Sequence, residues 1–233
     1  MTAAEAARVL TRRGLLISVA ALLGLAGVYV LALGYTPVEA RQGLAQKIFY
    51  LHVPAAWSAL MAFSLVGITS GLYLWLQDPR LDRFAAASAE VGVAFSAVML
   101  TTGPIWAKPI WGTWWTWDAR LTLTLFLFFL FIGYLALRAS VHDPAERARF
   151  SAVVGLLGML LVPFIHLSVY LFRTLHPQPI VLKPSAPSLP PEMLRTLLIS
   201  MLVFTALYVG LVTLRYGLGL AEDARDEATD VAG

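Results

Sequence analysis

Six stretches of mostly apolar residues constrain the fold of this chain more than any other feature of its sequence. A helix needs about 20 consecutive apolar residues to cross the hydrocarbon core of a bilayer. Of the 233 residues, 59% are hydrophobic and only 13% are charged, whereas soluble domains have roughly 25% charged residues. We therefore predict an all-α, polytopic integral membrane protein with six transmembrane helices. The apolar stretches cover about 14–34, 54–76, 85–105, 120–138, 150–172 and 193–215.

The first apolar stretch follows Arg8, Arg12 and Arg13 and resembles a secretory signal sequence. Its length of about 20 residues exceeds the usual apolar core of about 7–15 residues, and no convincing A-x-A-like cleavage site closes it. A retained signal-anchor is therefore expected. Residues 1–216 are interpreted as one six-span domain without an internal repeat, and residues 217–233 as a polar, disordered cytoplasmic tail.

The second stretch begins with Pro54, which suits the first turn of a helix because the N–H that proline lacks would be unpaired there. The next turns carry the small residues Ala55, Ala56 and Ala59, which permit close approach of another helix. We therefore expect this span to pack closely against a neighbour.

An even number of spans places both termini on the same side of the membrane. Ten Lys and Arg residues are expected on that side and seven on the other, so the positive-inside rule modestly favours cytoplasmic termini. The outer loops are then about 35–53, 106–119 and 173–192. Several of their cations stand near histidines and tryptophans in the sequence, where an anionic ligand would need them.

The central outer loop contains five of the seven tryptophans within twelve residues. An aromatic belt is the simplest alternative, but belt residues are spread over several helix ends. The i, i+3, i+4, i+7 spacing of one helix face is found for Trp111, Trp114, Trp115 and Asp118. If the segment after Pro109 forms a short surface helix, this face is an indole platform bordered by a carboxylate. Such a platform suits a large planar ligand.

The other two outer loops each contain a histidine near a membrane boundary, His52 before the second span and His176 after the fifth. A single interfacial histidine is often only solvated, but an opposed pair is what bis-histidine ligation of haem iron requires. His166 lies about 15 Å deeper than His176 by helical rise and is interpreted as structural. Cysteine is absent, so any metal must bind through histidine, carboxylate or methionine.

Three segments together resemble a known family. The run Trp-Gly-Thr-Trp-Trp-Thr-Trp-Asp-Ala-Arg at 111–120 resembles the tryptophan-rich WWD signature of haem-handling proteins in c-type cytochrome biogenesis. With the Tyr-Leu-His-Val-Pro-Ala-Ala-Trp segment at 50–57 and Thr-Leu-His at 174–176, the chain is similar to the haem exporter protein C family, the CcmC type. The similarity extends over about residues 45–215.

This resemblance implies a multi-pass protein of the bacterial inner membrane that holds haem b at the outer face. It implies presentation of that haem to a periplasmic haem chaperone of the CcmE type, without enzymatic activity of the chain itself. The further partners implied are the membrane subunit and the ATPase of an ABC transporter, of the CcmB and CcmA types, and a small single-span protein of the CcmD type.

The resemblance also implies roles for individual residues. His52 and His176 match the two axial ligands of the haem iron. The family's platform, which contacts haem or the chaperone, is matched in this sequence by Trp111, Trp114, Trp115, Trp117 and Asp118. The cations expected to face the haem propionates are Lys47, Lys108, Arg120, Arg173 and Lys183.

Two other functions stay open at the level of the sequence. A transporter that moves haem or another aromatic solute through the bilayer would need polar groups at mid-membrane, and the spans offer little besides His166 and Glu90. A membrane scaffold whose tryptophans bind only protein would leave the two boundary histidines unexplained. The chain has no G-x-x-x-x-G-K-[ST] motif, so ATP hydrolysis is expected of a partner.

Overall fold

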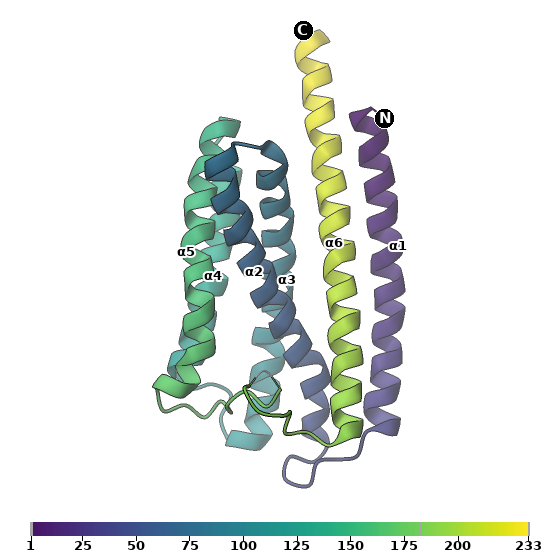
Figure 1. Ribbon diagram of the computed structural model, residues 1–233, viewed down its shortest axis with the longest axis vertical. Helices are drawn as coiled ribbons and strands as arrows, with labels where there is room; N and C mark the ends of the chain where they lie inside the picture. Colours follow the sequence, from purple (N-terminus) through teal and green to yellow (C-terminus); the bar gives the residue numbers. More distant parts are fainter. Residues whose placement is uncertain (1, 182, 233) are drawn as a thin grey trace.

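The computed structural model describes residues 2–181 and 183–232, with side chains as far as 225. Within these residues, six long helices run side by side, and both ends of the chain lie at the same end of the bundle (Figure 1). All six are long and apolar enough to cross a membrane, which confirms the predicted all-α, polytopic membrane fold. The helices are α1 (Ala3–Val30), α2 (Phe49–Leu76), α3 (Pro79–Trp111), α4 (Ala119–Ser140), α5 (Pro144–Leu171) and α6 (Pro191–Ala232).

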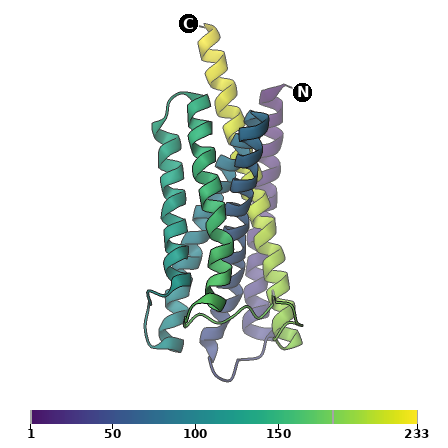
Figure 2. The ribbon, with the colours of Figure 1, turned by 60° about the vertical axis from the view of Figure 1, so that its left-hand side comes forward.

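The helices form two groups that meet along α6. In the first group, α1 packs mainly against α6, because glycines let the two backbones approach. A Cβ at Gly14 would overlap the backbone of Leu214, and one at Gly210 would overlap Ser18. The second group contains α2, α3, α4 and α5 (Figure 2). Its core includes the stacked rings of Phe63 and Phe131, with centroids 3.9 Å apart.

Pro54 lies inside α2, because the helix begins at Phe49; the predicted first-turn position was therefore wrong. Inside a helix, proline cannot donate to the carbonyl group four residues earlier, here that of Tyr50. The hydroxyl of Ser200 in α6 donates to this carbonyl oxygen at 2.6 Å. The proline thus exposes a buried acceptor that joins α2 to α6.

The last helix continues past the predicted end of the sixth span. The sequence predicted a disordered tail from residue 217, whereas α6 is helical as far as Ala232. Alanine, glutamate and arginine are good helix formers, and Arg83 of α3 donates to the carboxylate of Asp223 at 3.0 Å. Local propensity and this contact account for the helical extension.

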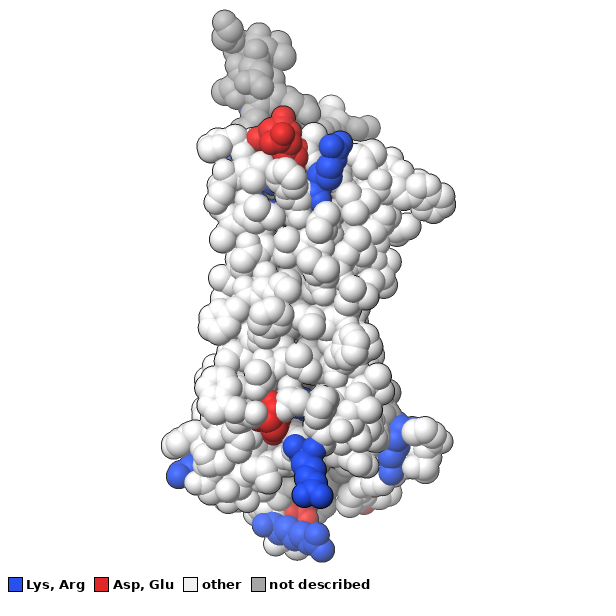
Figure 3. Space-filling model, turned by 90° about the vertical axis from the view of Figure 1, so that its left-hand side faces the viewer, with Lys and Arg blue, Asp and Glu red and all other residues white. Residues whose placement is uncertain are grey.

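The two ends of the bundle differ in their connections. At the end with the termini, short turns join α2 to α3 and α4 to α5. At the opposite end lie the irregular segments 36–43, 112–118 and 172–190, and we call this end the loop end. Figure 3 shows charged side chains near both ends, and between them on the face in view a band without charged side chains. The irregular segments of the loop end thus lie outside this uncharged band.

Candidate functional site

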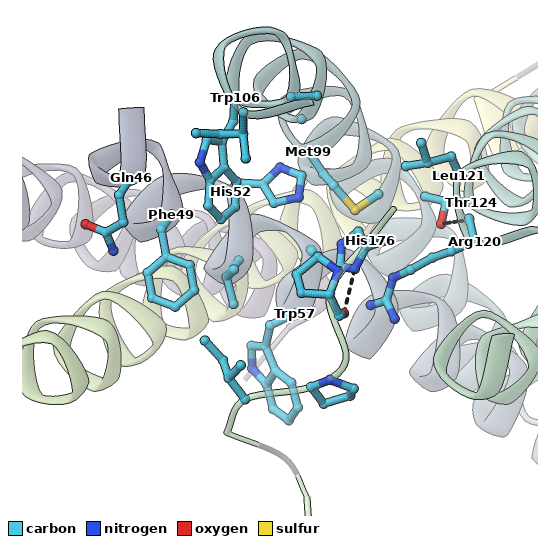
Figure 4. A pocket seen from close by; sticks show the side chains of 18 of the residues that line it. Gln46, Phe49, His52, Trp57, Met99, Trp106, Arg120, Leu121, Thr124 and His176 are labelled. Carbon is cyan, nitrogen blue, oxygen red and sulfur yellow. Dashed lines mark hydrogen bonds between the residues drawn. The ribbon is translucent and has the colours of Figure 1, made fainter. Parts of the chain in front are cut away.

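A cavity of 410 Å³ lies among the helices near the loop end (Figure 4). Its volume falls within the range of about 300–1,000 Å³ that is common for small-molecule sites. The wall is mostly apolar and is formed by α2, α3, α4, α5 and α6, with further residues from all three segments that connect helices at the loop end. The aromatic side chains in this wall are Phe49, Trp57, Trp106, Trp111, Trp114 and Trp115.

His52 is positioned by the first turns of α2 and lines the cavity. Its Nδ1 lies 3.0 Å from the hydroxyl oxygen of Thr102 in α3. That hydroxyl has one hydrogen, which it donates to the main-chain oxygen of Val98 at 2.8 Å. Thr102 therefore accepts a hydrogen bond from Nδ1–H of His52. In this tautomer Nε2 keeps its lone pair, the form in which a histidine binds a metal.

His176 lies in the irregular segment after α5 and also lines the cavity. Its Nδ1 lies 3.0 Å from the main-chain oxygen of Pro177, which can only accept, so Nδ1 carries the hydrogen and Nε2 is free. Burial, together with the positive charge of Arg120, lowers the pKa of His176 to about 4. The imidazole is therefore neutral at neutral pH, as a metal ligand must be.

Figure 4 shows His52 and His176 at the same cavity, with the guanidinium of Arg120 beside His176. The two rings come from segments far apart in the sequence and have the same tautomer. Aromatic rings meet them at their edges, Trp106 at 5.8 Å from His52 and Trp111 at 6.4 Å from His176 between centroids. The tertiary structure thus brings together the two histidines that were predicted to act as a pair.

A third histidine, His166, stands on α5 in the wall of the same cavity. Its ring also contacts that of Tyr170, with centroids 6.5 Å apart. The sequence favoured a structural role for His166, and the structure places this residue in the wall of the cavity.

The tryptophan loop is not the surface helix that its spacing predicted. α3 ends at Trp111, because Gly112 takes a left-handed conformation (φ 76°) that terminates the helix. The following residues are irregular until Asp118, whose side chain accepts from the main-chain N–H of Leu121 and begins α4. Two helix ends therefore interrupt the segment, and its predicted single face does not form.

Three of the predicted tryptophans still reach the cavity, namely Trp111, Trp114 and Trp115. Trp117 lies outside the cavity wall, is 76% exposed and meets Trp115 edge to face at 5.8 Å. The indole Nε1 of Trp115 is buried and has no hydrogen-bond partner in the part of the chain that the structure describes. The loop therefore provides part of the wall and also an exposed aromatic surface.

Arg120 is the predicted cation that lines the cavity. It follows Asp118 in the first turn of α4, and its Nη1 is buried without a hydrogen-bond partner among the described residues. A buried guanidinium with a free donor is costly unless an acceptor reaches it. An anionic group in the cavity would compensate the positive charge of this guanidinium.

The other predicted cations do not line the cavity. Lys47 is buried and donates to the main-chain oxygens of Thr36 and Pro37, at 2.7 and 3.0 Å. It therefore fastens the chain after α1. Lys108 is exposed and donates to the main-chain oxygen of Gly112. Arg173 and Lys183 are likewise outside the wall, so Arg120 is the one of these five cations that lines the cavity.

Two tryptophans of the wall were not predicted, Trp57 and Trp106. Both could have been found from the helical spacing of their neighbours in the sequence. Val53, Ala56, Trp57 and Leu60 stand at i, i+3, i+4 and i+7 on α2, and all four line the cavity. The same spacing in α3 starts from Gly103 and includes Trp106, whose Nε1 donates to Gln42 at 3.0 Å. Extending the helix face that starts at Val53, next to His52, would have identified Trp57.

These features define a polytopic membrane protein with an aromatic cavity and a candidate bis-histidine site near one membrane boundary. A family model described as heme exporter protein C, CcmC, matches residues 2–229. The chain is 39% identical over 195 residues to heme exporter protein C of Bradyrhizobium diazoefficiens, covering 81% of this chain and 74% of that relative. It is 36% identical over 205 residues to heme exporter protein C of Haemophilus influenzae, covering 88% and 82%. The chain belongs to the heme exporter protein C family, which confirms the resemblance.

Proposed function

We propose that this protein serves haem export for c-type cytochrome biogenesis by holding haem b in the cavity at the loop end. Haem is the cargo here, and its iron would bind between Nε2 of His52 and Nε2 of His176. The observation that carries the proposal is the matched tautomer of the two rings, each of which donates Nδ1–H to an oxygen atom. Metal-bound histidines usually have such a partner, because it orients the ring and raises its basicity.

The remaining polar and aromatic groups of the cavity suit the rest of the haem molecule. A propionate carboxylate in the cavity would pair with the guanidinium of Arg120, a charge-assisted contact. Trp111, Trp114 and Trp115 offer ring surfaces to a flat macrocycle. Asp118 takes no part in this contact, since both its oxygens accept from other groups of the protein.

Presentation to a periplasmic chaperone of the CcmE type is supported by the exposed part of the tryptophan loop. Trp114 is 57% exposed and lines the cavity, while Trp117 is 76% exposed beside it. Exposed aromatic side chains are typical of binding surfaces. We infer that the loop end faces the periplasm across the bacterial inner membrane, with cytoplasmic termini. Partners of the CcmA, CcmB and CcmD types would complete the export system.

The absorption spectrum of the purified protein tests the two axial ligands. We expect haem to co-purify with the wild type as a low-spin, six-coordinate species. His52→Ala and His176→Ala should each retain much less haem, with high-spin spectra. His142→Ala is the matched control, because His142 is exposed near the opposite end of the bundle. Haem retention equal to that of the wild type in both cavity variants would overturn the ligand assignment.

Vesicles separate holding from transport through the bilayer. Purified protein in haem-free liposomes should bind added haem at one membrane face without accumulating it in the lumen. Accumulation of haem by the protein alone, lost in His52→Ala, would instead support a transporter.

A further inference from the structure

The carboxylate of Asp118 joins three segments of the loop end. One oxygen, Oδ1, accepts from the main-chain N–H of Leu121 at 3.0 Å and caps α4. The other, Oδ2, accepts from the hydroxyl of Thr116 at 3.2 Å and from that of Thr174 at 2.7 Å. Thr174 belongs to the segment that carries His176. The two oxygens of one side chain thus perform separate tasks.

The hydroxyl of Thr174 connects Asp118 to His176 by two hydrogen bonds. It has one hydrogen, which it donates to Asp118, and its oxygen therefore accepts the main-chain N–H of His176 at 3.1 Å. Both bonds have defined directions, and the first is charge-assisted, which makes it short and strong. The result is a continuous link from the start of α4 to the backbone of a candidate iron ligand.

His176 needs such a link because no helix holds it. Residues 172–190 have no regular helix or strand in the described part of that segment. Among the described residues, the imidazole of His176 hydrogen-bonds only to the oxygen of the next residue, Pro177, which belongs to the same segment. The hydrogen bond through Thr174 connects the backbone of His176 to a helix end.

We propose that Asp118 is a positioning residue that acts through the hydroxyl of Thr174 to hold His176 over the cavity. This inference rests on the proposed haem-holding function. It gives the aspartate of the tryptophan loop a role other than contact with haem. Loss of the link should free His176 from the iron while His52 stays bound. The haem would then become five-coordinate.

Two test substitutions and two controls separate the positioning of His176 from the capping of α4. Asp118→Asn retains a good capping side chain for α4 but cannot offer a carboxylate to both Thr116 and Thr174. Thr174→Val removes the hydroxyl and keeps the shape of the side chain. Thr174→Ser keeps the hydroxyl and should behave as the wild type. Thr116→Val is the matched control on the same carboxylate, because it leaves the link to His176 intact.

The readouts are haem affinity and the spin state of ferric haem in the full-length protein. We expect Asp118→Asn and Thr174→Val to bind haem about 10–100-fold more weakly, the usual effect of removing the partner of a metal ligand. Both should shift toward a high-spin spectrum, which added imidazole converts back to low-spin. A merely structural defect would not be reversed by imidazole.

The inference fails if Thr174→Val keeps the affinity and low-spin spectrum of the wild type while His176→Ala loses them. The proposed function fails instead if His176→Ala itself binds haem as the wild type does. If Asp118→Asn does not fold, as judged by its thermal transition, the Thr174 pair decides the matter alone.

Discussion

His52 and His176 face one cavity, yet the chain holds them in different ways. His52 belongs to a helix, its ring donates to Thr102 on a neighbouring helix, and Trp106 packs at its edge. His176 lies on an irregular segment that is connected to α4 through the hydroxyl of Thr174. Segments with few tertiary hydrogen bonds open more readily than packed helices. We therefore expect His52 to stay bound to the haem iron and His176 to dissociate from it more readily.

The largest effect is expected from removing each ring in turn and supplying free imidazole. His52→Gly and His176→Gly should both lose more affinity for haem than the roughly 100-fold upper end for a ligand's hydrogen-bond partner. Imidazole should restore low-spin haem readily in His176→Gly, because that ring sits beside an irregular segment. It should restore little in His52→Gly, where the space lies between α2 and α3. Absorption spectroscopy measures the rescue. Equal restoration of low-spin haem by imidazole in both variants would contradict the proposed difference between the two ligands.

A smaller effect is expected from Thr102→Val, which removes the acceptor of Nδ1–H of His52. Haem affinity should fall about tenfold, the lower end for such partners, while both ligands stay bound. The midpoint potential of the bound haem should rise, because a less basic imidazole stabilises the ferric iron less well. Thr174→Val should differ by losing its low-spin spectrum. Thr101→Val is the control, since Thr101 is exposed and bonds only within its own helix. An unchanged potential in Thr102→Val would refute the tautomer assignment.

The smallest effect is expected from Gly103→Ala. A Cβ at this position would lie 3.1 Å from Cε1 of His52, so the ring must move by a few tenths of an ångström. A side chain forced from its preferred rotamer costs about 0.5–1.5 kcal/mol, and haem affinity should fall by a similar amount. Gly133→Ala, which meets nothing within 4 Å, is the matched control. Titration of both variants with haem provides the measurement, and identical affinities would show that the His52 ring is not held tightly.

The fold was predictable from the sequence because a bilayer leaves few choices. Each apolar stretch of about 20 residues must form a helix to satisfy its own backbone hydrogen bonds in lipid. The helix limits were less predictable. Pro54 was expected at a helix start, yet a hydroxyl from α6 satisfies the carbonyl that this proline leaves free and lets α2 begin at Phe49.

The candidate site was predictable in its histidines and only partly in its other residues. His52 and His176 stood out because each is a rare ionisable residue at a membrane boundary. Lys47 and Asp118 stood out for the same reason, but in the structure both side chains hydrogen-bond to other groups of the protein. Residue type and sequence position show that a charge is present at the boundary. They do not show whether that charged group already hydrogen-bonds to a backbone oxygen or a hydroxyl of the protein.

The sequence by itself determined the number of spans and the family, because these depend on apolar length and on short runs of residues. It also predicted a role for the two histidines that line the cavity. Only the tertiary structure decided which side chains reach the cavity. Gly112 and Asp118 end one helix and begin the next within the tryptophan run, so no single periodicity describes that run. The tautomers of the two histidines are set by Thr102 and Pro177. The direction of a hydrogen bond depends on neighbours in space, and Thr102 stands fifty residues from His52 in the sequence.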